Sequence, residues 1–351
     1  MNSYDIVEWG KPLQVISRQK PVPVGSEVRV KIDCCGVCHS DLHIQDGILD
    51  LGNGNVVSFE SVGVTLPFTM GHEIVGVIDA VGPAASARIG ERCVVYPWQG
   101  CGNCYNCLNG REVDCPQARS LGTRRPGGYA DYVVVAHERY LLDYGTLDPM
   151  TAATCACSGL TAFSALNKLP SMTAEDSLML VGAGGLGLAA LHLAQTITPA
   201  RIVVGDIDEA KLKHAARAGA DAVVNLKNSD IQTLISEAAP QGVRAVIDFV
   251  GSAETVALML KVAGRGSTVI VVGLFGGALS LSTALLPMRN ITLRGSYVGS
   301  LEEMKALIKL AQKKPSSVMQ FQRYPMSRLN DALNELRSGR VTGRLVTVAG
   351  E

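Results

Sequence analysis

The sequence predicts an α/β protein of two domains, one rich in β-strands and one built on a doubly wound parallel sheet. The chain has 351 residues, more than one ordinary hydrophobic core holds, so two domains of typical size are expected. Short β-like runs punctuated by glycine and proline fill the chain up to about residue 155. From about residue 177 strand-like and helix-like segments alternate, which is typical of a parallel sheet covered by helices.

Individual segments support both halves of this prediction. In the first half, four runs predict strands, at residues 27–32, 74–82, 92–97 and 129–136. In the second half, the predicted strands are 177–181, 201–205, 222–225, 245–249 and 267–273, and the helices between them are 186–196, 208–218 and 231–238. Towards the C-terminus, two segments have helical periodicity and one predicts a strand, at residues 301–312, 329–339 and 344–349.

Composition restricts the partners of the protein. Lysine plus arginine and aspartate plus glutamate each total 32, so the formal net charge is zero, and we expect no nucleic-acid partner because no basic face is indicated. Charged residues make up 18% of the chain and apolar residues 47%. Since an average soluble protein has roughly 25% charged residues, this balance predicts surface buried against another subunit, and hence a homo-oligomer.

The location is predicted from the apolar segments. Residues 1–10 contain acidic side chains and no apolar core, so they do not resemble a secretory signal. The longest apolar runs, 178–194 and 268–287, are interrupted by glycine, histidine or serine and divide into strand and turn pieces better than into a membrane span of about 20 residues. We expect a soluble, cytoplasmic protein, in which ten cysteines indicate metal binding or catalysis rather than disulfides.

A glycine-rich turn follows the predicted strand at 177–181. It contains Gly182, Gly184 and Gly187 in a G-x-G-x-x-G pattern that also includes Gly185 and Leu186. Residues without Cβ let the backbone approach a pyrophosphate at a helix N-terminus, where free N–H groups and the helix dipole favour negative charge. The turn therefore indicates a nucleotide site, although a glycine turn of this kind also occurs for packing alone.

An acidic residue at the end of the next predicted strand supports dinucleotide binding. Asp206 lies 19 residues after Gly187, where a carboxylate accepts hydrogen bonds from the adenosine ribose. The same carboxylate would repel a 2′-phosphate, which predicts NAD rather than NADP as the cofactor. The alternative is that Asp206 is only the N-cap of the following helix.

Four cysteines lie close together in CGNCYNCLNGREVDC; they are Cys101, Cys104, Cys107 and Cys115. Four thiolates can surround a tetrahedral zinc and leave no open position, so this spacing predicts a structural site. An iron–sulfur cluster also binds four cysteines, but the usual ferredoxin spacings differ. Four buried free thiols are a further alternative, against which the polar, Asn-rich character of the loop argues.

A second set of metal-binding residue types is spread along the chain. Cys38 lies in CGVCHSDLH, and His72 lies in GHEIVG. A catalytic zinc needs three protein ligands and an open position, so a third ligand has to come from elsewhere. The segment TCACSGLTAF offers Cys155 and Cys157; the spacing does not distinguish them, and free cysteine is often simply buried.

Taken together, these motifs resemble the zinc-containing alcohol dehydrogenases of the medium-chain dehydrogenase/reductase family over nearly the whole chain. They occur in the order Cys38-His39-Ser40-Asp41, Gly71-His72-Glu73, the four-cysteine loop, the cysteine pair and GAGGLG. The resemblance implies a GroES-like catalytic domain at 1–158 and 299–351 and a Rossmann NAD-binding domain at 159–298. It also implies NAD and two zinc ions per chain, one catalytic and one structural.

The resemblance assigns the third ligand of the catalytic zinc. The family places it before a small residue, a glycine, an aliphatic residue and a threonine, which matches Cys157 and residues 158–161. Cys157 would also lie at the N-terminus of a helix continuing through Ala165, where the dipole stabilises a thiolate. Cys155 is then expected to be a buried thiol.

The resemblance further implies roles around the metal and the cofactor. Asp41 would orient His72 through its other ring nitrogen, and Glu73 would lie beneath the metal. Ser40 would take the alcohol proton and His43 would pass it to water. The cofactor would be contacted by three more residues: His39 and Arg344 near the pyrophosphate, and Lys211 near the adenosine ribose.

These residues predict reversible hydride transfer between an apolar primary or secondary alcohol and NAD, since zinc supplies the acidity that an alcohol lacks. The largely uncharged segment 44–70 is expected to form an irregular lobe beside the active-site mouth, with Trp98 and Tyr96 lining the substrate pocket. A polyol dehydrogenase or an NADP-dependent aldehyde reductase of the same fold is the alternative. A non-catalytic zinc protein is a rival of another class, but it should have lost Ser40, His43 or a zinc ligand.

Overall fold

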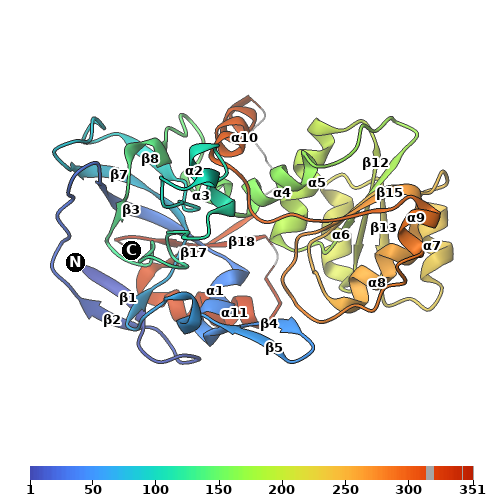
Figure 1. Cartoon of the computed structure of the whole chain (residues 1–351), viewed down its shortest axis with the longest axis horizontal. Helices are drawn as coiled ribbons and strands as arrows, with labels where there is room; N and C mark the ends of the chain where they lie inside the picture. The colour runs from blue at the N-terminus through green and yellow to red at the C-terminus, as the bar shows by residue number, and fades with distance from the viewer. Residues whose placement is uncertain (314–319, 342, 351) are drawn as a thin grey trace. The chain divides into compact units, whose positions relative to one another are not determined.

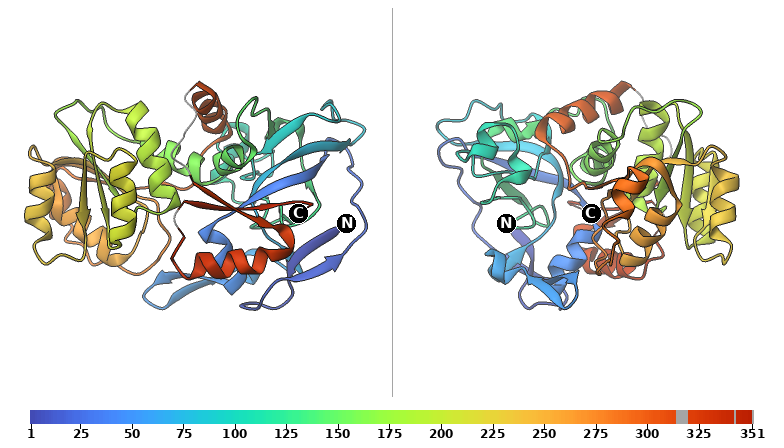
Figure 2. Two further views of the ribbon diagram at one scale, coloured as in Figure 1. Left: turned by 180° about the vertical axis from the view of Figure 1, so that it is seen from behind. Right: turned by 45° about the vertical axis from the view of Figure 1, so that its right-hand side comes forward.

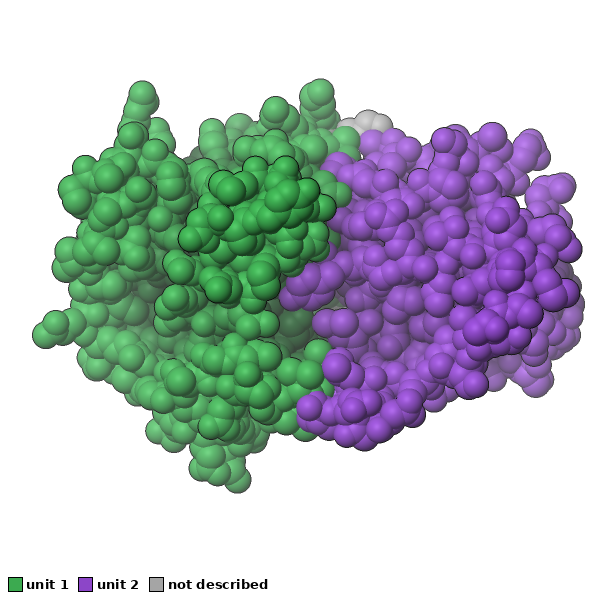
Figure 3. Space-filling view, in the orientation of Figure 1, with its two compact units in different colours: residues 1–49, 57–160, 298–351 green, residues 50–56, 161–297 purple. Residues whose placement is uncertain are grey.

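The computed structural model describes residues 1–313, 320–341 and 343–350, and its elements are shown in Figure 1. The chain divides into two compact units, which Figure 3 colours separately. The first comprises Met1–Leu49, Val57–Leu160 and Val298–Glu351, and the second comprises Asp50–Val56 and Thr161–Tyr297. Residues 314–319, 342 and 351 of the predicted C-terminal catalytic segment lie outside the described residues.

The first unit is built mainly on a seven-stranded sheet of order β10-β8-β7-β3-β18-β17, in which β9 also pairs with β3. The strands are β3 (Val28–Val37), β7 (Glu73–Val81), β8 (Arg92–Val95), β9 (Tyr132–Val135), β10 (Leu141–Leu142), β17 (Phe321–Pro325) and β18 (Arg344–Val348). A smaller sheet has the order β2-β1-β6 and contains β1 (Asn2–Ile6), β2 (Gln14–Ser17) and β6 (Phe68–Thr69). The β-rich character predicted for this half of the chain is therefore observed.

Helices of the first unit cover its sheets and carry site residues. They are α1 (His39–Asp46), α2 (Tyr105–Leu108), α3 (Pro149–Cys155), α10 (Leu301–Lys313) and α11 (Leu329–Arg337), together with the start of α4 (Ser158–Leu166). Helix α11 is tied to α1 by Arg337, whose guanidinium makes two 2.8 Å contacts to the Asp46 carboxylate. Buried Leu329 and Leu333 pack α11 into the core, as its predicted periodicity requires.

The second unit contains a six-stranded parallel sheet of order β13-β12-β11-β14-β15-β16. Its strands are β11 (Ser177–Val181), β12 (Arg201–Asp206), β13 (Ala222–Asn225), β14 (Val243–Asp248), β15 (Ala263–Val271) and β16 (Thr292–Gly295). The helices are α5 (Gly185–Ile197), α6 (Glu209–Arg217), α7 (Ile231–Ala238), α8 (Ala253–Val262) and α9 (Leu285–Arg289), and Figure 2 shows helices on both faces of the sheet. The predicted doubly wound fold is confirmed.

The segment 44–70 is more regular than the sequence analysis predicted. After α1 it forms a hairpin of β4 (Ile48–Gly52) and β5 (Asn55–Ser58), followed by a 3-10 turn at Glu60–Val62. Asn53 and Gly54 connect the strands with φ values of 54° and 75°, the left-handed pair that a tight hairpin turn requires. The expected irregular lobe was wrong for residues 48–58, and the Asn-Gly dipeptide was the sequence signal for the hairpin.

No helix within the described ranges has the length and apolarity needed to cross a bilayer.

Candidate active site

Four buried residues of the first unit form a cluster of possible metal ligands: Cys38, His72, Glu73 and Cys157. One ligand atom from each lies within 4.8 Å of all the others. The sulfurs of Cys38 and Cys157 are 3.8 Å apart, and two thiolates bound to a tetrahedral zinc at about 2.3 Å would be separated by about 3.8 Å. The donor set of two sulfurs, an imidazole and a carboxylate therefore fits zinc.

The sheet brings these residues together from distant parts of the chain. Strand β3 ends one residue before Cys38, and β7 begins one residue after His72. The antiparallel register pairs Gly36 with Glu73 on one side and with Val346 on the other. A Cβ at Gly36 would lie 1.9 Å from the Glu73 carboxylate, so glycine is needed for this close approach.

Cys157 lies where the sequence analysis expected it. Helix α3 ends at Cys155 and α4 begins at Ser158, so Cys157 immediately precedes the first turn of α4. Cys155 is buried outside the cluster, and burial raises its pKa to about 12. The geometry thus brings Cys157, and not Cys155, next to Cys38 and His72.

Asp41 connects the cluster to α1 and to a tyrosine. One oxygen of its carboxylate accepts hydrogen bonds from the Cys38 backbone N–H, at 2.9 Å, and from the Tyr129 hydroxyl, at 2.7 Å. The other oxygen lies 3.4 Å from Nδ1 of His72. Among the described residues neither buried ring nitrogen of His72 has a hydrogen-bond partner. A partnerless Nε2 next to two thiols is what a metal-binding imidazole oriented through Nδ1 should show.

Glu73 is held by a buried arginine. The guanidinium of Arg344 contacts both carboxylate oxygens, with an N–O distance of 2.5 Å. Both residues are almost completely buried, and burial raises the pKa of Glu73 to about 6. Arg344 thus balances the negative charge of the Glu73 carboxylate. Its role near the cofactor pyrophosphate stays a prediction, because its contacts here are with Glu73.

The proposed proton relay lies on α1. Ser40 Oγ is 3.6 Å from the Cys38 sulfur, and His43 follows three residues later, which places the two side chains next to one another on a helix. The His39 and His43 rings make an edge contact at 5.5 Å between centroids. His43 is half-buried and His39 exposed. Ser40 therefore lies next to the cluster, and His43 lies closer to the surface.

The two aromatic residues expected in the substrate pocket differ in position. Trp98 lies against His72, with 5.4 Å between ring centroids, and its indole N–H donates to the Ala156 carbonyl at 2.9 Å. Tyr96 is completely buried, and its hydroxyl donates to the Gly299 carbonyl at 2.8 Å. The structure therefore brings Trp98 to the cluster and places Tyr96 in the core, because the polar end of Tyr96 is used to hold the backbone.

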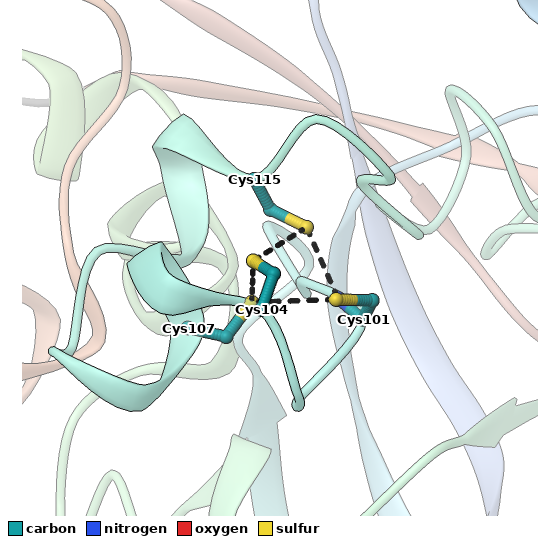
Figure 4. Close-up of side chains that lie close together, drawn as sticks. All are labelled: Cys101, Cys104, Cys107 and Cys115. Atoms are coloured by element: carbon teal, nitrogen blue, oxygen red, sulfur yellow. Dashed lines mark hydrogen bonds between the residues drawn. The ribbon is translucent and has the colours of Figure 1, made fainter.

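The four-cysteine loop forms the second cluster. Figure 4 shows the side chains of Cys101, Cys104, Cys107 and Cys115 converging. Neighbouring sulfurs are 3.5 Å apart for Cys104 and Cys107 and 3.7 Å apart for Cys104 and Cys115. These separations fit four thiolates around a tetrahedral zinc. The set has no open position for a substrate.

The glycine turn of the second unit has the geometry of an anion site. Gly182 follows β11 with a φ of 93°, and Gly184 is the N-cap of α5. A Cβ at Gly187 would lie 1.7 Å from the Gly182 carbonyl oxygen, so the tight turn requires glycine there. Gly185 and Leu186 form the first turn of α5, where free N–H groups favour a phosphate.

Asp206 ends β12 and faces this turn. Its carboxylate accepts hydrogen bonds from the backbone N–H groups of Ala183, at 2.6 Å, and Asp208, at 2.9 Å. The N-cap of α6 is Asp208, which accepts from Ala210 and from the Lys211 backbone. The N-cap interpretation of Asp206 is therefore wrong, since the cap position is two residues further on.

Comparisons with known proteins agree with this arrangement. A family model described as "Alcohol dehydrogenase GroES-like domain" matches residues 25–144, and one described as "Zinc-binding dehydrogenase" matches residues 185–313. The NAD-dependent alcohol dehydrogenases of Sulfurisphaera tokodaii and Saccharolobus solfataricus are each 36% identical to 99% of this chain, over 100% of their own length. The chain belongs to the zinc-containing alcohol dehydrogenases of the medium-chain dehydrogenase/reductase family. The resemblance inferred from the motifs is thus confirmed.

Solved structures of other dehydrogenases share the fold. The alcohol dehydrogenase of the archaeon Aeropyrum pernix superposes with a TM-score of 0.87 at 30% identity, covering 99% of this chain and 100% of its own. The D-arabinose dehydrogenase of Sulfolobus solfataricus superposes with a TM-score of 0.83 at 25% identity, covering 99% of this chain and 98% of its own. The GroES-like and Rossmann folds predicted from the sequence are therefore both confirmed.

The sequence analysis of this alcohol dehydrogenase did not identify two residues that support its sites, Tyr129 and Asp248. Tyr129 contacts Asp41 across 88 residues of chain, and no local motif signals such a contact. Asp248, at the end of β14, accepts from the N–H groups of Val250 and Gly251 and from the Thr255 hydroxyl. It fixes the loop whose Val250 side chain lies 3.1 Å from where a Gly182 Cβ would be. A buried acid at a parallel-strand C-terminus was the available signal.

Proposed function

We propose that the protein is an NAD- and zinc-dependent alcohol dehydrogenase that transfers hydride reversibly between an apolar primary or secondary alcohol and NAD. The observation that carries this proposal is the buried group of Cys38, His72 and Cys157, in which the two sulfurs are 3.8 Å apart and the imidazole Nε2 has no hydrogen-bond partner among the described residues. Family membership and the relatives' names support the same activity.

Different residues of the first unit have different roles in deprotonating an alcohol. Cys38, His72 and Cys157 would hold a zinc ion, which when bound supplies Lewis acidity that lowers the pKa of an alcohol hydroxyl. The Ser40 hydroxyl would receive the alcohol proton as it gives its own proton on towards the His43 imidazole, which then releases a proton to water. Asp41 keeps the His72 ring oriented through Nδ1.

The second unit would bind the cofactor. The glycine turn of residues 182–187 offers backbone N–H groups to the pyrophosphate, and Asp206 accepts hydrogen bonds from the adenosine ribose. Lys211 lies in the first turn of α6, beyond the Asp208 cap, and His39 is exposed on the first unit. We expect both to contact the cofactor. Because the Asp206 carboxylate repels a 2′-phosphate, NAD is preferred to NADP.

The four-cysteine loop would hold a second, structural zinc, since its four sulfurs converge and leave no open position. Its ligands would be Cys101, Cys104, Cys107 and Cys115. The catalytic domain is proposed to comprise residues 1–158 and 299–351, and the Rossmann domain residues 159–298.

A homo-oligomer in the cytoplasm is also proposed. Strand β16 lies at the end of the parallel sheet, and all four of its residues are exposed. Leu293 on this strand and Met288 just before it expose 37% and 70% of their surface. An exposed edge strand offers unpaired backbone groups to another chain, which favours a second copy of this chain as the partner.

The substrate is proposed from the apolar neighbourhood of the cluster, where the buried Trp98 ring lies next to His72. A polyol is the second candidate, because a dehydrogenase named for D-arabinose, a polyhydroxylated sugar, shares the fold over nearly the whole chain. An NADP-dependent aldehyde reductase is disfavoured by Asp206. Steady-state rates with a panel of aliphatic alcohols, aromatic alcohols, polyols and ketones decide among them.

The test combines this panel with both cofactors and an Asp206→Gly variant. We expect the highest kcat/KM with apolar alcohols and NAD, and a narrower NAD/NADP ratio in Asp206→Gly. Lys213→Ala, an exposed neighbour on α6, is the matched control and should keep the wild-type ratio. Higher kcat/KM with polyols than with apolar alcohols would favour the polyol dehydrogenase, the second candidate. Equal use of NAD and NADP by the wild type would refute the role of Asp206 in cofactor choice.

A further inference from the structure

The first unit has a cavity whose lining includes no residue of either cysteine cluster. Its volume is about 530 Å³, within the roughly 300–1,000 Å³ of typical small-molecule sites. Two segments line it, residues 62–68 and residues 117–126. Among the lining residues are Arg119, Arg124 and Arg125, together with Thr65 and Gln117. We call this the arginine cavity.

The charge of the arginine cavity is unbalanced. Within the described part of the chain, Arg119 and Arg125 form no ion pair, and Arg124 donates to a neutral group, the Val62 carbonyl, at 3.0 Å. Other arginines of the same unit do have acidic partners, as Arg337 does with Asp46 and Arg139 with Glu112. All three arginines are exposed, so their guanidinium groups are accessible to anionic oxygens.

The backbone that carries these arginines is ordered. The N–H groups of Arg124 and Arg125 both donate to the Ser120 carbonyl, at 2.9 and 3.0 Å, and the Arg125 carbonyl accepts from Gly122 at 2.7 Å. The turn is also anchored where Gly127 donates to Thr69 at 2.9 Å. Holding the backbone in place reduces the entropy that a ligand has to remove.

The same turn packs against the segment that carries His72. Ideal Cβ atoms at Gly122 and Gly127 would lie 2.3 and 2.1 Å from the Gly71 carbonyl oxygen, which also accepts from the Gly128 N–H at 2.7 Å. Gly71 directly precedes His72. Any variant of the turn therefore has to be checked for retained zinc.

We propose that the arginine cavity binds a small organic anion that carries two phosphate groups. Guanidinium groups match phosphate oxygens in pairs of parallel hydrogen bonds, and each phosphate monoester carries a charge of about −1.5 to −2 at neutral pH. Two such groups complement three arginines, whereas a single carboxylate would leave positive charge unbalanced. The Thr65 hydroxyl and Gln117 amide provide neutral polar contacts for the remainder of the ligand.

The test is isothermal titration of the zinc-loaded enzyme with fructose 1,6-bisphosphate as the probe. Saturating NADH is present throughout, so that phosphate cannot bind at the glycine turn. We expect one saturable site per chain, and affinity lowered about tenfold for each arginine removed in Arg119→Gln and in Arg119→Gln/Arg125→Gln. Arg88→Gln is the matched control, since the Arg88 side chain is 86% exposed and lies elsewhere on the unit.

The outcomes separate the alternatives. Zinc content and NAD-dependent turnover are measured for every variant, and the single Arg119→Gln variant decides if the double variant loses zinc. Absence of saturable binding to the wild type, or unchanged affinity in Arg119→Gln, would overturn the proposal. Tighter binding of tricarballylate than of the bisphosphate would overturn the phosphate assignment and show that the cavity prefers a polycarboxylate. A change of sedimentation coefficient in the variants, without probe binding to the wild type, would instead assign the arginines to a contact between subunits.

Discussion

The two cysteine clusters of the first unit differ in how their residues are brought together. The Cys38, His72, Glu73 and Cys157 cluster is completely buried and draws on β3, β7 and the turn between α3 and α4, whereas the four-cysteine cluster is partly exposed and comes from one loop. The first is supported by Asp41, Tyr129 and Arg344. We therefore expect the surrounding sheet to hold the first cluster together without its metal, and the loop to depend on its metal for its shape.

The largest expected effect is on turnover, in the buried cluster. Cys157→Ser should lose the catalytic metal and lower kcat at least about a thousandfold, yet keep the fold, because the sheet that supports the cluster remains. Cys155→Ser is the matched control, since Cys155 is buried outside the cluster as a thiol whose pKa is raised by burial to about 12. Zinc analysis, turnover and circular dichroism measure the pair. Activity lost in Cys155→Ser and kept in Cys157→Ser would transfer the ligand to Cys155.

The exposed loop should respond in the opposite way. Cys104→Ser removes the residue whose sulfur is within 3.7 Å of both Cys107 and Cys115. Because a closed zinc site contributes directly to folding, we expect the free energy of unfolding to fall by more than about 3 kcal/mol. The molecules that stay folded should turn over at nearly the wild-type rate.

Thermal unfolding and active-site titration test this expectation for Cys104→Ser. A variant with wild-type stability but abolished turnover would contradict the division between a structural and a catalytic cluster. Ser substitution at Cys93, a buried thiol outside both clusters, is the control for replacing a buried sulfur by oxygen.

A smaller effect is expected from the hydrogen bonds that support the buried cluster. Tyr129→Phe removes the 2.7 Å hydrogen bond to Asp41 while Asp41 keeps its contact with the Cys38 N–H. Burial and the neighbouring Asp41 raise the pKa of Tyr129, so in the wild type the phenol stays protonated and donates. Losing a partner of this kind typically lowers metal affinity or activity by about 10- to 100-fold. A competition assay with a zinc chelator measures it, with Tyr132→Phe on β9 as the control.

The difference between the clusters also explains what the sequence could predict. The four-cysteine loop is local, so its spacing alone indicated the site, as the alternation of strands and helices indicated the parallel sheet. The contacts of Asp41 with Tyr129 and of Glu73 with Arg344 join residues 88 and 271 positions apart, and only the folded chain reveals them. The burial of Tyr96 could not be predicted either, because an aromatic near Trp98 in sequence can be on either side of the strand end.

The smallest expected effect concerns the proton path from the buried cluster to water. The four-cysteine loop needs no such path, because no proton transfer is proposed there. Burial lowers the pKa of His43, and the neighbouring His39 lowers it further, so the imidazole stays neutral and able to accept a proton at pH values below the usual range near 6.5. At pH values above the His43 pKa the wild type therefore has the internal base, whereas at lower pH the ring is protonated and the relay is blocked.

In His43→Ala the proton has to pass directly to water or buffer, and we expect alcohol oxidation to be slowed about tenfold near pH 6.5. The difference should shrink as pH rises, because hydroxide and buffer bases replace the imidazole. His137→Ala, with a ring outside the cluster that accepts from the Arg139 N–H, is the control. A pH–rate profile of His43→Ala that superposes on that of the wild type would mean that the proton leaves the buried cluster by another route.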